Sequence, residues 1–217
     1  MDSLIQIIAI AALPVIFAIT LHEAAHGYAA RFFGDRTADR EGRISLNPLR
    51  HIDPVGTVLV PVVILLLSGA SLLFGWAKPV PVDFSRLRRP KQDMLWVAAA
   101  GPAANLFMAL AWGLLFKLAQ VLPETAYTLP MLKMADIGMD INVALMLLNL
   151  LPLPPLDGGR ILVSLLPIRQ AIAFSRIEPW GFPLLLLLLF TGVLSAVLDP
   201  LMGLMRFLLA LIFNFHA

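Results

Sequence analysis

Five long segments of the sequence contain no charged residue, and they restrict the fold more than any other feature. They cover residues 4–21, 55–77, 94–116, 141–156 and 179–198. A helix needs about 20 apolar residues to cross the hydrocarbon core of a bilayer. Hydrophobic residues make up 59% of the 217-residue chain and charged residues 14%, so a water-soluble fold of this size could not cover its apolar surface. The sequence predicts an all-α polytopic membrane protein.

The apolar segments also predict how the chain is organised. A sixth stretch, residues 207–215, can join residues 201–205 as a short final helix, which gives five to six transmembrane or re-entrant segments. We expect one membrane-embedded domain over residues 1–217, with a core over about 4–166 and C-terminal helices over about 179–215. The chain has no cysteine, so any metal must be bound by His, Asp, Glu or Asn side chains.

The distribution of Lys and Arg predicts the orientation, because cytoplasmic loops of membrane proteins are rich in these residues. Basic residues cluster after the first apolar segment, before residue 94 and after residue 157, whereas residues 123–140 contain only Lys133. A full crossing by residues 55–77 would place two basic loops on opposite sides. A re-entrant hairpin, bending at Pro61 or in residues 68–71, would keep both inside. The charge rule slightly favours the hairpin and leaves the crossing open.

The motif His22-Glu23-Ala24-Ala25-His26 predicts a metal site. Residues four apart lie on the same face of a helix, so both imidazoles can reach one metal ion at about 2.0–2.1 Å. Glu23 is displaced around the helix and suits a base that acts on water, as in the HExxH zinc peptidases. Such a match can arise by chance in a soluble protein. Ionisable groups at membrane depth are costly, and they usually face a functional interior.

A third metal ligand must come from elsewhere in the chain. Asp157 follows a proline-rich stretch and precedes two glycines, a pattern typical of a broken helix at membrane depth. The alternative is that Asp157 only caps the helix that follows it. The two remaining histidines are His51, in an interfacial loop, and the penultimate His216, and we expect both at the surface.

Several short motifs in their order resemble the site-2 protease family of intramembrane metalloproteases. They are His22–His26, Leu156-Asp157-Gly158, a GPxxN match at Gly101–Asn105 and an NxxP match at Asn149–Pro152. The resemblance covers residues 4–166, about three-quarters of the chain. Many family members carry a PDZ domain or an additional N-terminal helix. We expect this chain to be a compact member without either of them.

The resemblance implies roles for six residues. His22, His26 and Asp157 would bind one zinc ion per chain, and Glu23 would be the general base and then the acid to the leaving amine. Asn149 would act near the metal on the oxyanion or the substrate backbone, and Asn105 would help to bind an extended substrate. From the residues alone, Asn105 and Asn149 could equally be interhelical hydrogen-bonding residues.

Residues 42–48 alternate polar and apolar side chains, which predicts a short strand after the HExxH helix. In the resembling family, sheet near the active site can pair with a substrate strand. Such pairing would expose backbone that a transmembrane helix hides. The alternative is a surface loop.

The resemblance implies an enzyme that hydrolyses peptide bonds of transmembrane substrates, in regulated intramembrane proteolysis. Its partners would be single-pass membrane proteins, the lipid bilayer and a regulatory membrane protein, and the net charge of +2 does not favour nucleic acid. The expected location is a bacterial inner membrane, with the active site toward the cytoplasm. Two alternatives are a metal or ion transporter and a catalytically silent relative that retains the fold.

Overall fold

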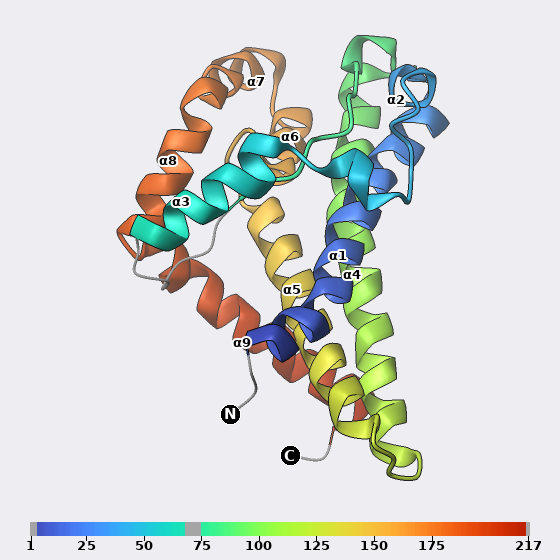
Figure 1. Cartoon of the computed structure of the whole chain (residues 1–217). Helices are drawn as coiled ribbons and strands as arrows, with labels where there is room; N and C mark the ends of the chain where they lie inside the picture. Colours follow the sequence, from blue (N-terminus) through green and yellow to red (C-terminus); the bar gives the residue numbers. More distant parts are fainter. Residues whose placement is uncertain (1–3, 68–74, 216–217) are drawn as a thin grey trace.

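The structure is a computed structural model that describes residues 4–67 and 75–215, and no strand occurs within those two ranges. Three long helices run side by side, α1 (Leu4–Phe32), α4 (Pro90–Val121) and α5 (Thr128–Leu150), as Figure 1 shows. The other elements are α2 (Thr37–Arg40), η1 (Pro48–His51), η2 (Pro54–Leu59), α3 (Val60–Leu67), η3 (Phe84–Arg86), α6 (Asp157–Leu165), α7 (Ile168–Ser175), α8 (Glu178–Phe190) and α9 (Val193–Phe213).

Small side chains allow the three long helices to pack closely. Ala18 on α1, Ala109 on α4 and Ala135 on α5 are all 0% exposed. Small residues at helix interfaces let backbones approach, which is the usual packing in membranes. Large apolar side chains face outward instead, and Phe107 and Leu211 are 70% and 68% exposed. The arrangement places small residues inside and large apolar residues where lipid would surround them.

Among the described residues, three helices are long and apolar enough to cross a membrane, namely Ala9–Phe32, Pro90–Val121 and Val193–Phe213. A fourth span is possible if α7 and α8, bent by 61°, count as one broken span. These helices indicate an integral membrane protein. The expected count of five to six segments is not confirmed. One reason is that α5 contains three charged residues, Lys133, Asp136 and Asp140, and each of these charges reduces its hydropathy.

The C-terminal boundaries differ from the expected ones. Residues 179–198 do not form one segment, because Gly192 adopts a positive φ of 75° between α8 and α9. The short final helix expected from residue 201 is instead part of α9, which continues through Asp199, Pro200 and Arg206. A left-handed backbone residue ends a helix, whereas an exposed charged side chain does not interrupt one.

The two described ends of the segment 55–77 lie next to each other. Trp76 N–H donates to Gly56 O at 3.0 Å, and Lys78 N–H donates to His51 O at 2.9 Å. The Thr57 hydroxyl also donates to Trp76 O at 2.9 Å. Both ends of the segment are therefore adjacent, which agrees with the re-entrant alternative and not with a crossing. The expected bend at residues 68–71 lies outside the described residues.

The strand expected over residues 42–48 is absent from the described structure. Asn47 accepts the Leu49 N–H at 3.0 Å and starts the helical turn η1 at Pro48. The adjacent segment contains Pro79 and Pro81, which have no N–H to donate to a ladder. Residues 42–48 therefore form a loop, the alternative left open by the sequence.

The basic connections gather at one end of the bundle (Figure 1). At this end Arg88 N–H donates to Phe33 O at 3.0 Å, and the Lys91 ammonium group donates to Leu166 O. These contacts join the end of α1, the start of α4 and the end of α6. The start of α1, the end of α9 and the connection between α4 and α5 lie at the opposite end (Figure 1).

Candidate metal centre

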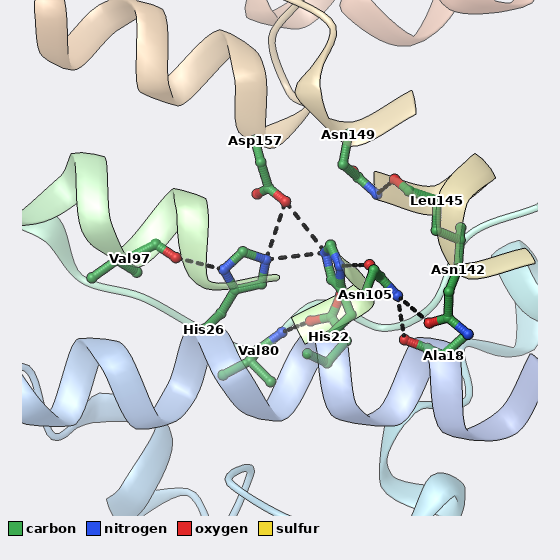
Figure 2. Close-up of polar contacts among 11 residues, drawn as sticks. Ala18, His22, His26, Val80, Val97, Asn105, Asn142, Leu145, Asn149 and Asp157 are labelled. Carbon is green, nitrogen blue, oxygen red and sulfur yellow. Dashed lines mark hydrogen bonds and ion pairs between the residues drawn. The ribbon is translucent and has the colours of Figure 1, made fainter. Parts of the chain in front are cut away.

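Three side chains from two distant segments meet between α1 and α6. His22 and His26 lie one turn apart on the same face of α1, and Asp157 is the first residue of α6. The two Nε2 atoms are 3.1 Å apart, and Asp157 Oδ2 lies 3.3 Å from His22 Nε2 and 3.2 Å from His26 Nε2. Figure 2 shows the three groups pointing at one another. His22 and Asp157 are only 7% and 6% exposed.

Hydrogen bonds at the opposite ring nitrogens determine which lone pairs face this centre. His22 Nδ1 lies 2.6 Å from Asn105 Oδ1, and His26 Nδ1 lies 2.7 Å from Val97 O. Both oxygens only accept, so each Nδ1 carries the proton and each Nε2 presents a lone pair. Asp157 Oδ2 is buried, and within the described part of the chain it has no hydrogen-bond donor. With both imidazoles neutral, three atoms that can each bind a metal therefore converge on one point.

The geometry fits a tetrahedral zinc ion. Ligand atoms bound at about 2.0–2.1 Å with tetrahedral angles lie about 3.3 Å apart. The three separations here, 3.1, 3.2 and 3.3 Å, are close to that value. Two imidazoles and a carboxylate are a ligand set found in catalytic zinc sites, and such sites leave a fourth position open. His22, His26 and Asp157 are thus the described residues that could hold the metal.

The local backbone explains how Asp157 reaches the histidines. α5 ends at Leu150, and a turn rich in proline precedes α6. The N-cap position of α6 belongs to Leu156, and the Asp157 carboxylate faces His22 and His26, which does not match the capping alternative. Gly158 and Gly159 lie so close to the backbone of this turn that a Cβ on either one would collide with it. These glycines let α6 start directly against the turn, with its carboxylate directed at α1.

Glu23 lies beside the centre and is held by a distant segment. Its Oε2 accepts the Val80 N–H at 2.8 Å. Among the described residues, Oε1 has no hydrogen-bond partner. The side chain is half-buried. One carboxylate oxygen is thus fixed and the other remains available for a water molecule.

The segment that holds Glu23, residues 76–83, is a strap across α1 and is itself anchored. Arg43 donates through Nη2 to Lys78 O and Pro79 O, at 3.1 Å each. At its far end, Asp83 N–H donates to the buried Asp35 carboxylate at 2.8 Å. The Ser85 hydroxyl and Arg86 donate to the Asp83 carboxyl and hold its pKa below the usual value. The strap is therefore fixed at both ends.

The two asparagines expected near the substrate have other contacts. Asn105 is 0% exposed, and its amide contacts His22, Ala18 and another buried asparagine, Asn142. It offers no free group to a substrate, and the interhelical alternative describes it. Asn149 donates to Leu145 O of its own helix at 3.0 Å. Its expected action near the metal stays a prediction.

The expectation for His51 was wrong. His51 is 2% exposed, and its Nε2 donates to Ser45 O at 2.8 Å, because the loop and strap fold over it. It does not belong to the metal-facing group. His216 lies outside the described residues.

Gly101 was part of a recognised motif, but its function was not anticipated. A Cβ at this position would lie 2.6 Å from His22 Cε1 and from His22 Nε2, and it would also collide with His26 Nε2. Only a hydrogen atom fits between α4 and the two imidazoles. A glycine inside an otherwise helical apolar pattern is the signal that could have indicated this close approach.

We expect Gly101→Ala to weaken zinc binding by at least about 10-fold, because the added methyl group must displace the imidazoles from their positions. The measurement is zinc affinity by competition with a chelator. Gly203→Ala is the matched control, since nothing lies within 4 Å of a Cβ at Gly203 in α9. Equal zinc affinity in Gly101→Ala and wild type would contradict the close approach.

Fold and site together define a helical membrane protein whose metal-facing residues lie beside a carboxylate, that of Glu23. Comparison with known proteins specifies the class further. The model of peptidase family M50 matches residues 115–192, which include Asp157. YwhC of Bacillus subtilis, named as a zinc metalloprotease, is 39% identical over 87% of this chain and 84% of its own length. The chain belongs to this family, the site-2 proteases, and is a metalloprotease.

Two further relatives carry the name zinc metalloprotease Rip2. The protein from Mycolicibacterium smegmatis is 32% identical over 83% of this chain and 66% of its own length. The protein from Mycobacterium tuberculosis is 30% identical over 64% of this chain and 51% of its own length. No solved structure matches the chain significantly.

Proposed function

We propose that this protein is an intramembrane zinc metalloprotease that hydrolyses peptide bonds of transmembrane substrates. The observation that supports it most is the triangle of His22 Nε2, His26 Nε2 and Asp157 Oδ2, with sides of 3.1–3.3 Å. Glu23, next in sequence to His22, provides a base beside that triangle. A transport site would need the ligands but would have no use for this base.

The proposed reaction is a hydrolysis in which Glu23 moves one proton. Zinc bound by His22, His26 and Asp157 would supply a Lewis acid that polarises the scissile carbonyl and makes water more acidic. Glu23 Oε1 takes a proton from the water, whose oxygen forms a bond to the carbonyl carbon. Glu23 then returns the proton to the amide nitrogen as the carbon–nitrogen bond breaks. Val80 N–H keeps the Glu23 carboxylate oriented through both steps.

The substrates we propose are single-pass membrane proteins, which must unwind locally before cleavage. A transmembrane helix satisfies all its amides internally, so its carbonyl groups are not accessible to a nucleophile. Asn149 remains our candidate for binding the oxyanion or the substrate backbone. A further membrane protein would regulate access to the site.

The test uses purified protein in lipid vesicles, with a panel of tagged single-pass peptides. We expect cleavage within or next to the apolar segment of at least one peptide, mapped by mass spectrometry. A chelator should stop the cleavage and added zinc should restore it. Zinc that crosses the vesicle membrane without any peptide cleavage would favour the transporter instead.

We also propose that the active site faces the cytoplasm of a bacterial inner membrane. Support comes from the basic connections, which lie at one end of the bundle, because such loops are retained in the cytoplasm. The chain has no cysteine, so a single introduced one reports its own side. We expect Glu41→Cys to be protected and Thr125→Cys to be labelled by an impermeant thiol reagent in intact cells. The reverse pattern would contradict the orientation.

A further inference from the structure

A chain of buried amides leads from α5 to the metal centre. His22 Nδ1 lies 2.6 Å from Asn105 Oδ1, and Asn105 Nδ2 donates to Asn142 Oδ1 at 3.0 Å. Asn142 Nδ2 in turn donates to Gly138 O at 2.8 Å. Both asparagines are 0% exposed. Figure 2 shows Asn142 and Asn105 following one another toward His22.

Two backbone carbonyl groups, Gly138 O and Ala18 O, fix the direction of the hydrogen bonds that link Asn142, Asn105 and His22. Gly138 O can only accept, so Asn142 directs its NH₂ group at Gly138 and its oxygen at Asn105. Ala18 O also accepts only, and it receives a second hydrogen bond from Asn105 Nδ2 at 3.1 Å. The Asn105 NH₂ group is thus used by Asn142 and Ala18, and its oxygen must face His22.

The consequence at His22 concerns its tautomer. Because Asn105 presents an oxygen, His22 Nδ1 must carry a proton, and Nε2 presents its lone pair to Asp157 and His26. If the Asn105 amide turned over, its NH₂ group would face His22 Nδ1 and favour the other tautomer. That tautomer has a proton on Nε2 and cannot bind a metal there.

We propose that Asn142 is a positioning residue that fixes the orientation of the Asn105 amide and, through it, the metal-binding tautomer of His22. This inference rests on the proposed zinc site. Asn142 contacts neither His22 nor the centre, and it acts from a third helix. The alternative is an ordinary hydrogen bond between α4 and α5, which would contribute to the stability of the fold but not to zinc affinity. If the proposal holds, loss of the Asn142 amide lowers zinc affinity, whereas under the alternative it leaves zinc affinity unchanged.

The experiment measures zinc affinity of the full-length protein in detergent by chelator competition, for wild type, Asn142→Leu and Asn142→Asp. Removing a group that orients a metal ligand typically costs 10–100-fold in affinity. Ala18 still holds Asn105, so we expect the lower end, about 10-fold, for Asn142→Leu. Asn142→Asp keeps the oxygen that accepts from Asn105, and its affinity should fall between those of wild type and Asn142→Leu.

A second readout follows the tautomer directly. The chain has four histidines, so the ¹⁵N signals of labelled imidazoles can be resolved. In the zinc-free protein, His22 should show a proton on Nδ1 in wild type and a mixture of tautomers in Asn142→Leu. Val143→Ala is the matched control, because Val143 is the next residue, is 1% exposed and lies in the core. It should lower the unfolding temperature without changing zinc affinity or the tautomer.

The outcomes are separable. Unchanged zinc affinity and an unchanged His22 tautomer in Asn142→Leu would overturn the inference and leave the proposed function intact. If wild type binds no zinc, the proposed function fails, and the tautomer measurement still decides the role of Asn142. If Asn142→Leu does not fold, Asn142→Ala removes the same amide and provides the same comparison.

Discussion

Asp157→Ala is expected to abolish both stable zinc binding and cleavage. Asp157 supplies the one anionic ligand atom, 3.2–3.3 Å from the two Nε2 atoms. Loss of a ligand should cost more than the 10–100-fold that follows loss of an orienting group. His22 and His26 alone would then be left as two neutral ligands. Zinc content of the purified variant is the first measurement, followed by cleavage.

The variant needs a control for charge and for folding. Asp157→Asn keeps the shape of the side chain but removes the negative charge, and we expect it to bind zinc weakly. Asp39→Ala removes an exposed carboxylate that pairs with Arg31 at 3.2 Å, and it should leave zinc content unchanged. Full zinc occupancy in Asp157→Ala would show that another residue is the third ligand.

Glu23→Gln is expected to lower the cleavage rate by about 10²–10⁴-fold, the usual contribution of a general acid–base group. Glutamine has nearly the same shape, and its oxygen can still accept the Val80 N–H that now reaches Glu23 Oε2. It cannot take a proton from water. Since Glu23 is not among the three metal-facing residues, zinc content should stay at the wild-type level. The measurements are cleavage rate and zinc content of the same sample.

The comparison that isolates the base is Glu41→Gln. Glu41 is exposed and follows the short helix α2, so its replacement should change neither quantity. Cleavage by Glu23→Gln at the wild-type rate would exclude Glu23 as the base. Loss of zinc from this variant would instead mean that Glu23 supports the metal site directly.

Local spacing was sufficient to predict that two of the three metal-facing residues share a helix face. The i, i+4 separation of His22 and His26 fixes their common face of α1, whatever the rest of the chain does. Asp157 could be proposed because prolines and glycines interrupt a helix there. Its exact partner atoms depend on how α6 packs on α1, and no local pattern contains that information.

The contacts that the sequence did not reveal are all long-range. Val80 can reach Glu23 because the two ends of the segment 55–77 lie together, and charge distribution alone left that arrangement undecided. Asn142 lies in an apolar segment. No residue near it in the sequence indicates whether it orients a metal ligand or only forms an interhelical hydrogen bond. Gly101 is recognisable as a close approach only when α1 is placed against α4.

Helix boundaries were the least predictable part of the fold. A membrane-spanning helix carries apolar residues on all its faces, so the helical periodicity of apolar residues does not show where it begins and ends. Charged residues were used instead, which failed at Asp199 because α9 continues through it. Gly192, whose φ is 75°, was the actual boundary. The single domain over residues 1–217 stays a prediction.

The most direct test of the account is zinc K-edge X-ray absorption on the purified wild-type protein. We predict one zinc per chain in a four-coordinate site, with two imidazole nitrogens and carboxylate and water oxygens at about 2.0–2.2 Å. This result would match the ligand set that His22, His26 and Asp157 provide, without any knowledge of the substrate. A protein that contains no zinc, or zinc with no imidazole in its first coordination sphere, would contradict the central claim.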